Sequence, residues 1–278
     1  MAMRARFKRW GVTGLCLVVL TAFMVGANRL MTRQAVLPTV GTDSPLLSAV
    51  FVAMGGARGI LSEVLWWRIS ELQRQDRYAE VMPLTDLLVT LDPASPDTWV
   101  YNSWNLAYNI SAAHHADADR WHWVKQGVVL LERGLRITPK ATPILRQLGW
   151  TFEDKIGRNS DQSAPYYRAH LSELPPPADA TFFAARLGIV PDWNNAQIRA
   201  LYWYDCAADA TGQLRVLVGM LVATPQRDLM PYFLSIAGAN WDRLLVRQQH
   251  QIYGFLQHLY KTYPHWTEVA AFLQEKTL

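Results

Sequence analysis

Three stretches of helical periodicity follow one another along the middle of the chain, and each ends at a proline. These prolines are Pro93, Pro139 and Pro175. Within each stretch, two runs of apolar residues at helical spacing are separated by a short break, which is typical of a helical hairpin. Such a hairpin cannot bury its apolar side alone and must stack on a neighbour. The pattern therefore predicts an all-α fold in which hairpins stack over residues 62–175.

The first interval between these prolines exceeds the roughly 34 residues of an undecorated hairpin repeat by about a dozen. We place this insertion around residues 110–120. The predicted repeats are 62–95, 96–139 and 140–175. Before them, residues 35–61 are expected to form a linker and a short helix. After them, residues 176–278 form a C-terminal helical extension, with helices expected over 194–209, 212–223, 228–237, 240–262 and 265–275.

The N-terminus carries an uncharged apolar run over residues 11–27, preceded by Arg4, Arg6, Lys8 and Arg9. A helix rises about 1.5 Å per residue, so a run of this length just reaches across a bilayer core. We predict a transmembrane signal anchor over residues 1–34, in a single-pass protein of the inner (cytoplasmic) membrane. The basic residues place the N-terminus in the cytoplasm and the bulk of the chain outside it, in the periplasm. Alternatively, the chain is cleaved after Ala27, which would release a soluble exported product.

Composition limits the class of protein further. Half of the 278 residues are hydrophobic and 12 are Trp, so the chain can bury a sizeable core. The formal net charge of +4 is matched by the four basic residues near the N-terminus, and no basic stripe is visible elsewhere. We therefore expect no nucleic-acid partner. Cys16 and Cys206 lie in segments expected in different compartments, so no disulfide between them is expected.

Several positions match the tetratricopeptide repeat. With Ser62 as the first position, Tyr78 and Pro93 occupy the places of the usual aromatic residue and terminal proline. Trp99 stands where the second repeat usually has its Trp, whereas the first repeat has Leu65 there. The chain thus resembles tetratricopeptide-repeat proteins, which implies a helical solenoid that binds other proteins.

Longer strings make the resemblance more specific. They are Leu65-Trp66, Arg77-Tyr78, the run from Trp104 to Ser111, the run from Arg120 to Val124, Leu148-Gly149-Trp150, Lys155-Ile156-Gly157, Asp192-Trp193 and Leu201-Tyr202-Trp203. Together they resemble an uncharacterised family of bacterial membrane-anchored proteins with tetratricopeptide-like repeats. That resemblance implies an exported helical-repeat protein and no particular reaction.

Repeat geometry also indicates where a partner would bind. The first helix of each hairpin lines the concave groove of a tetratricopeptide array, and its second, fifth, ninth and twelfth positions point inward. The predicted partner-binding residues are Glu63, Trp66, Ser70, Gln73, Asp97, Val100, Trp104 and Ala107. Their mixture of aromatic, amide and acidic side chains suits an extended peptide or a partner helix.

One cluster resembles a set of metal ligands: His114, His115, Asp117, Asp119 and His122. None of the standard zinc spacings is present, and the acidic residues have a simpler role as helix caps. We expect no metal site, no cofactor and no catalytic residue. Glu153, Asp154 and Lys155 are interpreted as an exposed helix end rather than as acid–base machinery.

The leading hypothesis is a membrane-anchored, exported scaffold that mediates protein–protein interaction in the cell envelope. One alternative is an accessory subunit of a membrane protein complex, and another is a metal-dependent hydrolase centred on the cluster between His114 and His122. The aromatic residues near the C-terminus are expected to pack on the array or to form a second docking surface. These residues are Tyr253, Phe255, Tyr260, Tyr263, Trp266 and Phe272.

Overall fold

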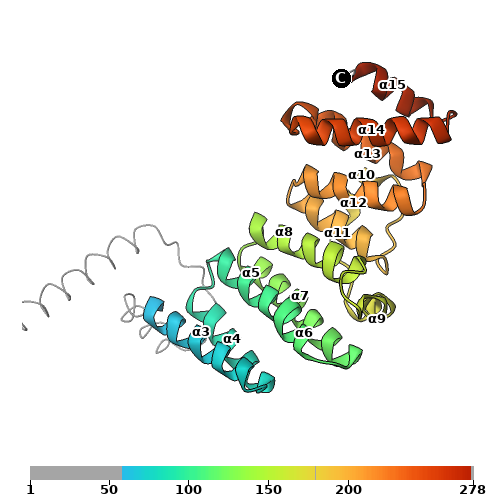
Figure 1. The fold of residues 1–278 in the computed structure, drawn as a ribbon. Coiled ribbons are helices and arrows are strands. Elements are labelled where there is room, and N and C mark those ends of the chain that lie inside the picture. Colours follow the sequence, from blue (N-terminus) through green and yellow to red (C-terminus); the bar gives the residue numbers. More distant parts are fainter. Residues whose placement is uncertain (1–57, 179, 277–278) are drawn as a thin grey trace, which may run out of the picture. The chain divides into compact units, whose positions relative to one another are not determined.

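The computed structural model describes residues 58–178 and 180–276, and every regular element in these ranges is a helix (Figure 1). The predicted all-α class is thereby confirmed for the described part of the chain. The chain divides into two compact units, one ending at Thr98 and one beginning at Trp99. We call them unit 1 and unit 2 and describe each by itself.

The predicted location requires a correction. Among the helices that the structure describes, none combines the length and the apolar character needed to cross a bilayer. A single-pass location in the inner membrane is therefore not supported. Residues 11–27, on which that prediction was based, lie outside the described residues, as do the possible cleavage site after Ala27 and most of the predicted 35–61 segment.

The described part of unit 1, from Arg58 onward, forms a helical hairpin. Helix α3 (Arg58–Arg74) is followed by a short 3₁₀ turn, η1 (Tyr78–Glu80), and by α4 (Val81–Leu91). The chain reverses at Asp76, whose φ of 56° is tolerated because a short polar side chain suits the left-handed region. Apolar residues at helical spacing bury one side of each helix against the other. These residues are Leu65, Ile69 and Leu72 of α3 with Val81, Leu88 and Leu91 of α4.

Unit 2 begins inside α5 (Pro96–Trp104), which continues without a break through η2 (Asn105–Ile110) into α6 (Ser111–Ala113). Helix α7 (Asp117–Ile137) returns along α6 and η2. The next pair joins α8 (Thr142–Trp150) and its continuation η3 (Thr151–Gly157) to α9 (Ala164–Ala169) and η4 (Leu171–Glu173). Each pair thus brings together helices that follow one another along the chain, while the assignment of these pairs to tetratricopeptide-like repeats stays a prediction.

The remainder of unit 2 continues the helical succession. Its elements are α10 (Thr181–Leu187), α11 (Ala196–Cys206), α12 (Ala210–Ala223), η5 (Arg227–Leu229), α13 (Met230–Asn240), η6 (Trp241–Arg243), α14 (Val246–Thr262) and α15 (Thr267–Glu275). Helix α11 packs on α8 and η3 on one side and on α12 on the other, while α15 packs on α13 and α14. Side chains cap the starts of α11 and α12, because Asn195 accepts from the amide of Gln197 and Asp209 from that of Gly212.

The helices expected in the C-terminal extension agree closely with those observed, apart from two differences. Helix α10 was not expected, although its end is marked by Gly188 at a φ of 77°, a common way to stop a helix. The helix expected over 240–262 begins only at Val246. Before it, the short turn η6 buries Trp241 against Phe272.

Candidate functional site

The predicted groove residues differ in how far they reach the surface. In α3, Glu63 and Ser70 are exposed and Trp66 and Gln73 are half-buried. In the helix that begins at Pro96, Asp97 is exposed, Val100 is half-buried and Trp104 keeps 38% of its surface. Ala107, in contrast, is completely buried. A Cβ added to Gly127 of α7 would lie 3.0 Å from the Ala107 Cβ, so Ala107 belongs to the core rather than to a groove.

Three aromatic side chains form a row along α5 and η2, which we call the aromatic row: Tyr101, Trp104 and Tyr108. The ring centroids of Tyr101 and Trp104 are 6.2 Å apart, and those of Trp104 and Tyr108 are 6.1 Å apart. Tyr101 is 52% exposed. Tyr108 reaches toward η3, where its hydroxyl lies 3.5 Å from Asp154 Oδ2. Burial and the nearby carboxylate of Asp154 raise the pKa of Tyr108, so its hydroxyl stays protonated at neutral pH.

Two helices of unit 2 contain a π-helical segment, η2 in the first and η3 in the second. Such segments are rare and are often found at functional sites, because they redirect side chains within a helix. Segment η3 directs Glu153 and Lys155 into two separate groups of polar side chains. Both side chains are nearly inaccessible, at 1% and 5%. The interpretation of residues 153–155 as an exposed helix end is therefore wrong for Glu153 and Lys155.

Glu153 accepts hydrogen bonds from three side chains, and together these four residues form what we call the Glu153 cluster. Arg215 of α12 donates from Nε and Nη2 over 2.7 and 2.6 Å, one bond to each carboxylate oxygen. Arg158 donates from Nη2 over 2.5 Å, and the hydroxyl of Tyr204 over 2.8 Å. A buried carboxylate needs such partners to offset the loss of hydration, and four charge-assisted bonds supply them.

Tyr204 is held in place by two glycines. A Cβ added to Gly149 of α8 would lie 2.7 Å from the Tyr204 ring, and one added to Gly212 of α12 would lie 2.6 Å from it. Only glycine lets both helices approach the ring this closely. Tyr204 is 2% exposed and therefore has little freedom to move, so its hydroxyl is held within hydrogen-bond distance of Glu153.

The Glu153 cluster has an excess of positive charge. Two guanidinium groups share one carboxylate, and both lie near the indole of Trp150, at 6.0 Å for Arg158 and 5.5 Å for Arg215. The hydrogen bonds to Glu153 raise the pKa of Arg215 still further above its usual range. Burial is the main reason that the pKa of Tyr204 is raised, so its hydroxyl stays a donor. The cluster thus carries one net positive charge at neutral pH.

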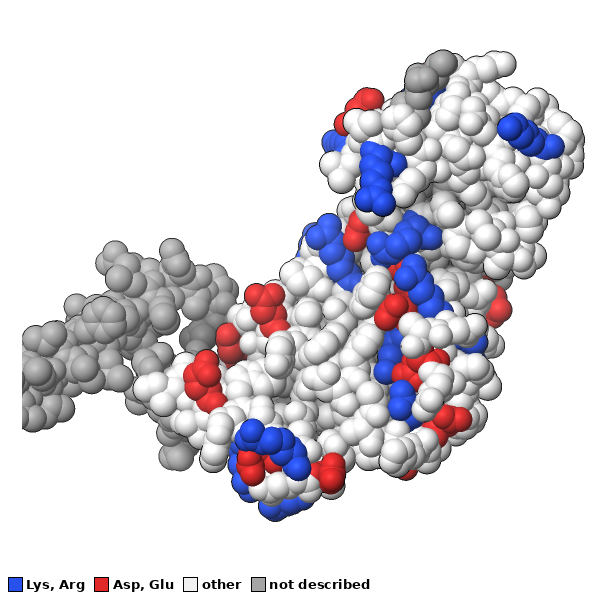
Figure 2. Space-filling view, viewed as in Figure 1, with Lys and Arg blue, Asp and Glu red and all other residues white. Residues whose placement is uncertain are grey.

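A cavity of about 390 Å³ opens beside this cluster, and we call it the arginine pocket. Arg158 and Arg215 line one side, with side chains 44% and 39% exposed. The lining also includes Glu153, the amide of Gln197 and the helix α12 at Val216 and Met220. Figure 2 shows Lys and Arg gathered with acidic side chains among them over the part of unit 2 that runs from α8 to α12. The pocket therefore combines a cationic edge with a partly apolar wall.

Lys155 belongs to a second group, closed to solvent, which we call the Asp161 cluster: Lys155, Asp161, Arg120 and Tyr167. Lys155 Nζ lies 2.5 Å from Asp161 Oδ2, and Arg120 Nη2 lies 2.8 Å from both oxygens. Burial alone would raise the pKa of Asp161, but bonds from Lys155, the Ser163 amide and Arg120 outweigh it and lower the pKa. All three charged side chains are less than 10% exposed, so this cluster ties η3 and α7 to the segment before α9.

Residues of the cluster that resembles a set of metal ligands make other contacts. The His114 ring stacks on Trp123 at 6.0 Å, and the His122 ring meets the same indole edge-on at 5.3 Å. Asp117 accepts a hydrogen bond from Ser163 Oγ over 2.5 Å rather than capping α7. Throughout the described residues, no three His, Cys, Asp or Glu side chains are grouped so as to hold a metal ion. The hydrolase alternative therefore has no ligand set in this part of the chain.

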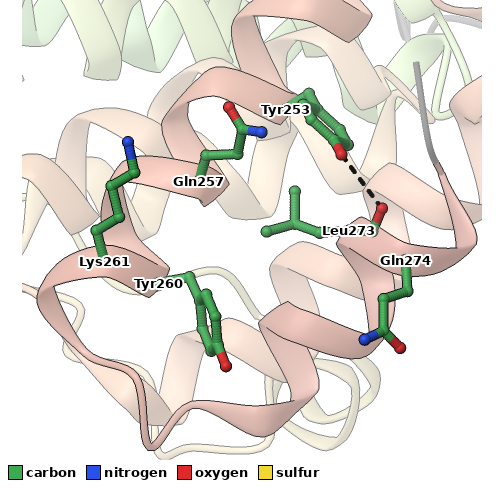
Figure 3. A pocket seen from close by; sticks show the side chains of 6 residues that line it. All are labelled: Tyr253, Gln257, Tyr260, Lys261, Leu273 and Gln274. Carbon is green, nitrogen blue, oxygen red and sulfur yellow. Dashed lines mark hydrogen bonds between the residues drawn. The ribbon is translucent and has the colours of Figure 1, made fainter.

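The aromatic residues near the C-terminus divide between packing and surface. Trp266 and Phe272 are buried, and Trp266 stacks on Tyr263 at 4.8 Å. Tyr253 and Tyr260 line a cavity of about 450 Å³ between α14 and α15, together with Gln257, Lys261, Leu273 and Gln274 (Figure 3). The Tyr253 hydroxyl lies 3.4 Å from the carbonyl of Leu273. This cavity has a single charged side chain among its lining residues, so the arginine pocket is the stronger candidate site.

Comparison with protein-family models, with curated proteins and with solved structures finds no match. The family resemblance inferred from the sequence strings remains a prediction. Sequence reasoning did not find the Glu153 cluster, because its members are separated by up to 62 positions along the chain. The available signals were two glycines, Gly149 and Gly212, and the unbroken polar run 153–155 between Phe152 and Ile156.

Proposed function

We propose that the chain is a tetratricopeptide-like adaptor that holds a partner protein against the aromatic row on α5 and η2. The observation that carries this proposal is the exposure of Trp104 and Tyr101, at 38% and 52%, on the first helix of a hairpin. Tryptophan and tyrosine are enriched in protein interfaces and dominate their binding energy, because each buries a large area with few rotatable bonds. Repeat geometry had indicated Trp104 as a partner-binding position.

The base of the aromatic row supports the same proposal. Trp99, which precedes the row on α5, is 2% exposed and lies against α7 at Gly134, where an added Cβ would be 2.9 Å from the indole. Ala107 fixes the following turn against Gly127. The exposed rings are therefore carried by a helix whose other side is tightly packed. A preorganised surface binds with a smaller loss of conformational entropy than a mobile one.

Site-specific photocrosslinking tests the proposal. A photoreactive phenylalanine analogue at position 101, in the full chain and in its native cell extract, is expected to yield one discrete adduct. The substitution Trp104→Ala should abolish that adduct, because loss of a central interface tryptophan weakens binding by about 30-fold or more. With the partner identified and purified, calorimetry should give the same loss of affinity.

Two controls make the result specific. The analogue at Val222, a 67% exposed position on α12, should not yield the same adduct. The substitution Phe182→Ala, at an aromatic residue that is 41% exposed on α10, should change the affinity for the partner less than twofold. An adduct that persists undiminished with Trp104→Ala, or that forms equally from position 222, would rule out the aromatic row as the binding surface.

A further inference from the structure

We infer that the arginine pocket binds a carboxylate side chain of a peptide segment, and that an adjoining groove takes the apolar side chain beside it. This inference rests on the proposed function, since it specifies a feature of the protein partner. The ligand is thus a peptide in which Asp or Glu neighbours a large apolar residue. Its recognition would use charge in one cavity and apolar contact in the other.

The first argument is the set of hydrogen-bond donors that Glu153 leaves unused. Arg158 binds Glu153 through Nη2 alone, and Arg215 binds it through Nε and Nη2. Within the described part of the chain, Nε and Nη1 of Arg158 and Nη1 of Arg215 make no hydrogen bond. Both guanidinium groups line the pocket and are held in position by the carboxylate they share. A second carboxylate in the pocket would meet fixed donors with matching geometry.

The second argument is the amount of charge. Two guanidinium groups and one carboxylate leave one positive charge, which a single carboxylate neutralises. A phosphate group carries close to two negative charges at neutral pH and would be left with an excess. The pocket wall at Val216 and Met220 further favours a ligand with an apolar stem over a free inorganic anion. A carboxylate on a peptide side chain satisfies both requirements.

The third argument is a second cavity on the neighbouring side of α12, which we call the apolar groove. It has a volume of about 400 Å³, and Leu214, Val218, Leu244 and Ile252 form its apolar lining. Arg215 lines both this groove and the arginine pocket. Gln248 and Gln251 also line this groove, and the side-chain amide of Gln251 can bind a peptide backbone.

The spacing of side chains on α12 explains how the two cavities adjoin. Residues three and four apart share a face of a helix. Val216 and Met220 therefore point into the arginine pocket, whereas Leu214 and Val218 point into the apolar groove. Arg215 stands at the border between these faces. A peptide that crosses α12 at Arg215 would present adjacent side chains to the two cavities.

Selection of peptides from a random heptapeptide phage library on the full chain tests the inference. The expected result is enrichment of sequences in which Asp or Glu stands beside Leu, Ile, Val, Met or Phe. Enrichment of sequences without an acidic residue, or no enrichment, would overturn the inference. Fluorescence polarisation with the most enriched peptide then gives its affinity.

Substitutions in both partners isolate the charge contact. Arg158→Gln leaves Glu153 bound to Arg215 and Tyr204, and should weaken the selected peptide about tenfold or more. Replacing the acidic residue of the peptide by its amide should cause a similar loss, with little further loss when both changes are combined. Additive losses would show that the two groups do not meet. Arg146→Gln is the matched control, since Arg146 is an exposed α8 arginine paired with Asp209, and should change the affinity less than twofold.

Two further arms separate the possible outcomes. Inorganic phosphate that displaces the peptide as effectively as an equal concentration of free unlabelled peptide would indicate a general anion site and overturn the inference. Selection on the Trp104→Ala chain shows whether the pocket depends on the aromatic row. If the Trp104→Ala chain still selects acidic sequences, the arginine pocket is upheld even where crosslinking at the aromatic row fails. If the parent chain selects no acidic sequences, the arginine pocket is overturned, but a successful crosslinking result still supports the aromatic row.

Discussion

The hydroxyl of Tyr204 donates a hydrogen bond to Glu153 Oε2 over 2.8 Å, and neither residue is more than 2% exposed. The bond joins α11 to the π-helical segment η3. Arg215 completes a triangle, since its Nη2 lies 2.9 Å from the Tyr204 hydroxyl and 2.6 Å from Glu153. A neutral donor thus sets the position of the carboxylate that holds both arginines of the pocket.

Tyr204→Phe removes this bond and leaves the ring between its two glycines. We expect a loss of about 1 kcal/mol in the free energy of unfolding, because Glu153 keeps its three bonds to arginine. Urea denaturation followed by circular dichroism measures it. Tyr166→Phe is the control, since Tyr166 is half-buried, stacks on His170 and makes no hydroxyl bond to any residue that the structure describes. Equal effects of the two changes would argue against a specific role for the Tyr204 hydroxyl.

Gly149→Ala places a methyl group 2.7 Å from the Tyr204 ring, which must shift to avoid overlap. Overpacking of this kind costs about 1–3 kcal/mol in the free energy of unfolding. The same substitution at Gly219 of α12 meets no atom within 4 Å and should be neutral or stabilising by up to about 1 kcal/mol. Thermal denaturation of both variants checks the difference, and a destabilised Gly219→Ala alone would contradict it.

Asp161→Asn leaves the buried side chains of Arg120 and Lys155 without their shared carboxylate. We expect a cost of about 3–5 kcal/mol in the free energy of unfolding at neutral pH, because two buried cations then lose their shared counter-charge. Asp119→Asn is the control, since Asp119 is exposed in the first turn of α7 and should cost under about 1 kcal/mol. Urea titrations of both variants provide the comparison.

The effect of Asp161→Asn should depend on pH. The pKa of Asp161 in the folded protein lies below its ordinary value of 3.8, so the unfolded chain takes up this proton first as the pH falls. The stabilisation from the carboxylate is therefore fully present above about pH 4 and is lost as the pH falls through the folded-state pKa. The difference in unfolding free energy between the parent protein and Asp161→Asn should therefore narrow below pH 4. A difference that stays constant with pH would show that the Asp161 carboxylate does not stabilise the fold in this way.

Trp99 and Trp104 lie on the same helix, and their substitution should lower the free energy of unfolding by very different amounts. Trp99→Ala empties a buried site against Gly134 and is expected to cost about 3–5 kcal/mol in the free energy of unfolding. Trp104→Ala removes a side chain that is 38% exposed and should cost far less. Denaturation curves decide this, and a strongly destabilised Trp104→Ala would mean that the ring is needed for folding rather than for a partner.

The helices of the C-terminal extension could be predicted because their signals are local. Apolar spacing indicates α12 and α14, and capping residues such as Asn195 mark where helices begin. Helix α10 escaped prediction because seven residues give barely two turns of periodicity. The interruption before α14 depends on burial of Trp241, a contact with Phe272 that no local pattern encodes.

The candidate site was much harder to predict. The exposure of Trp104 could be predicted from repeat positions, and its role in binding a partner stays a prediction. Glu153 could not be predicted, since a charged residue in a helix is ordinarily exposed, and its burial requires Arg215 from another helix. Reasoning from repeat positions also predicted that Ala107 lines the groove. In the structure, Ala107 lies in the π-helical segment η2 and is buried in the core.

A π-helical segment contains one more residue than an α-helical segment with the same number of turns. Removing one residue from Thr151–Gly157 would let that helix close as a regular α-helix, yet it would rotate every later side chain by about 100°. Glu153 and Lys155 would then no longer face their separate clusters at the same time. The extra residue therefore lets one helix direct two opposite charges toward two different groups of side chains. An insertion or deletion in this segment should be tolerated far less than any single substitution of an exposed side chain.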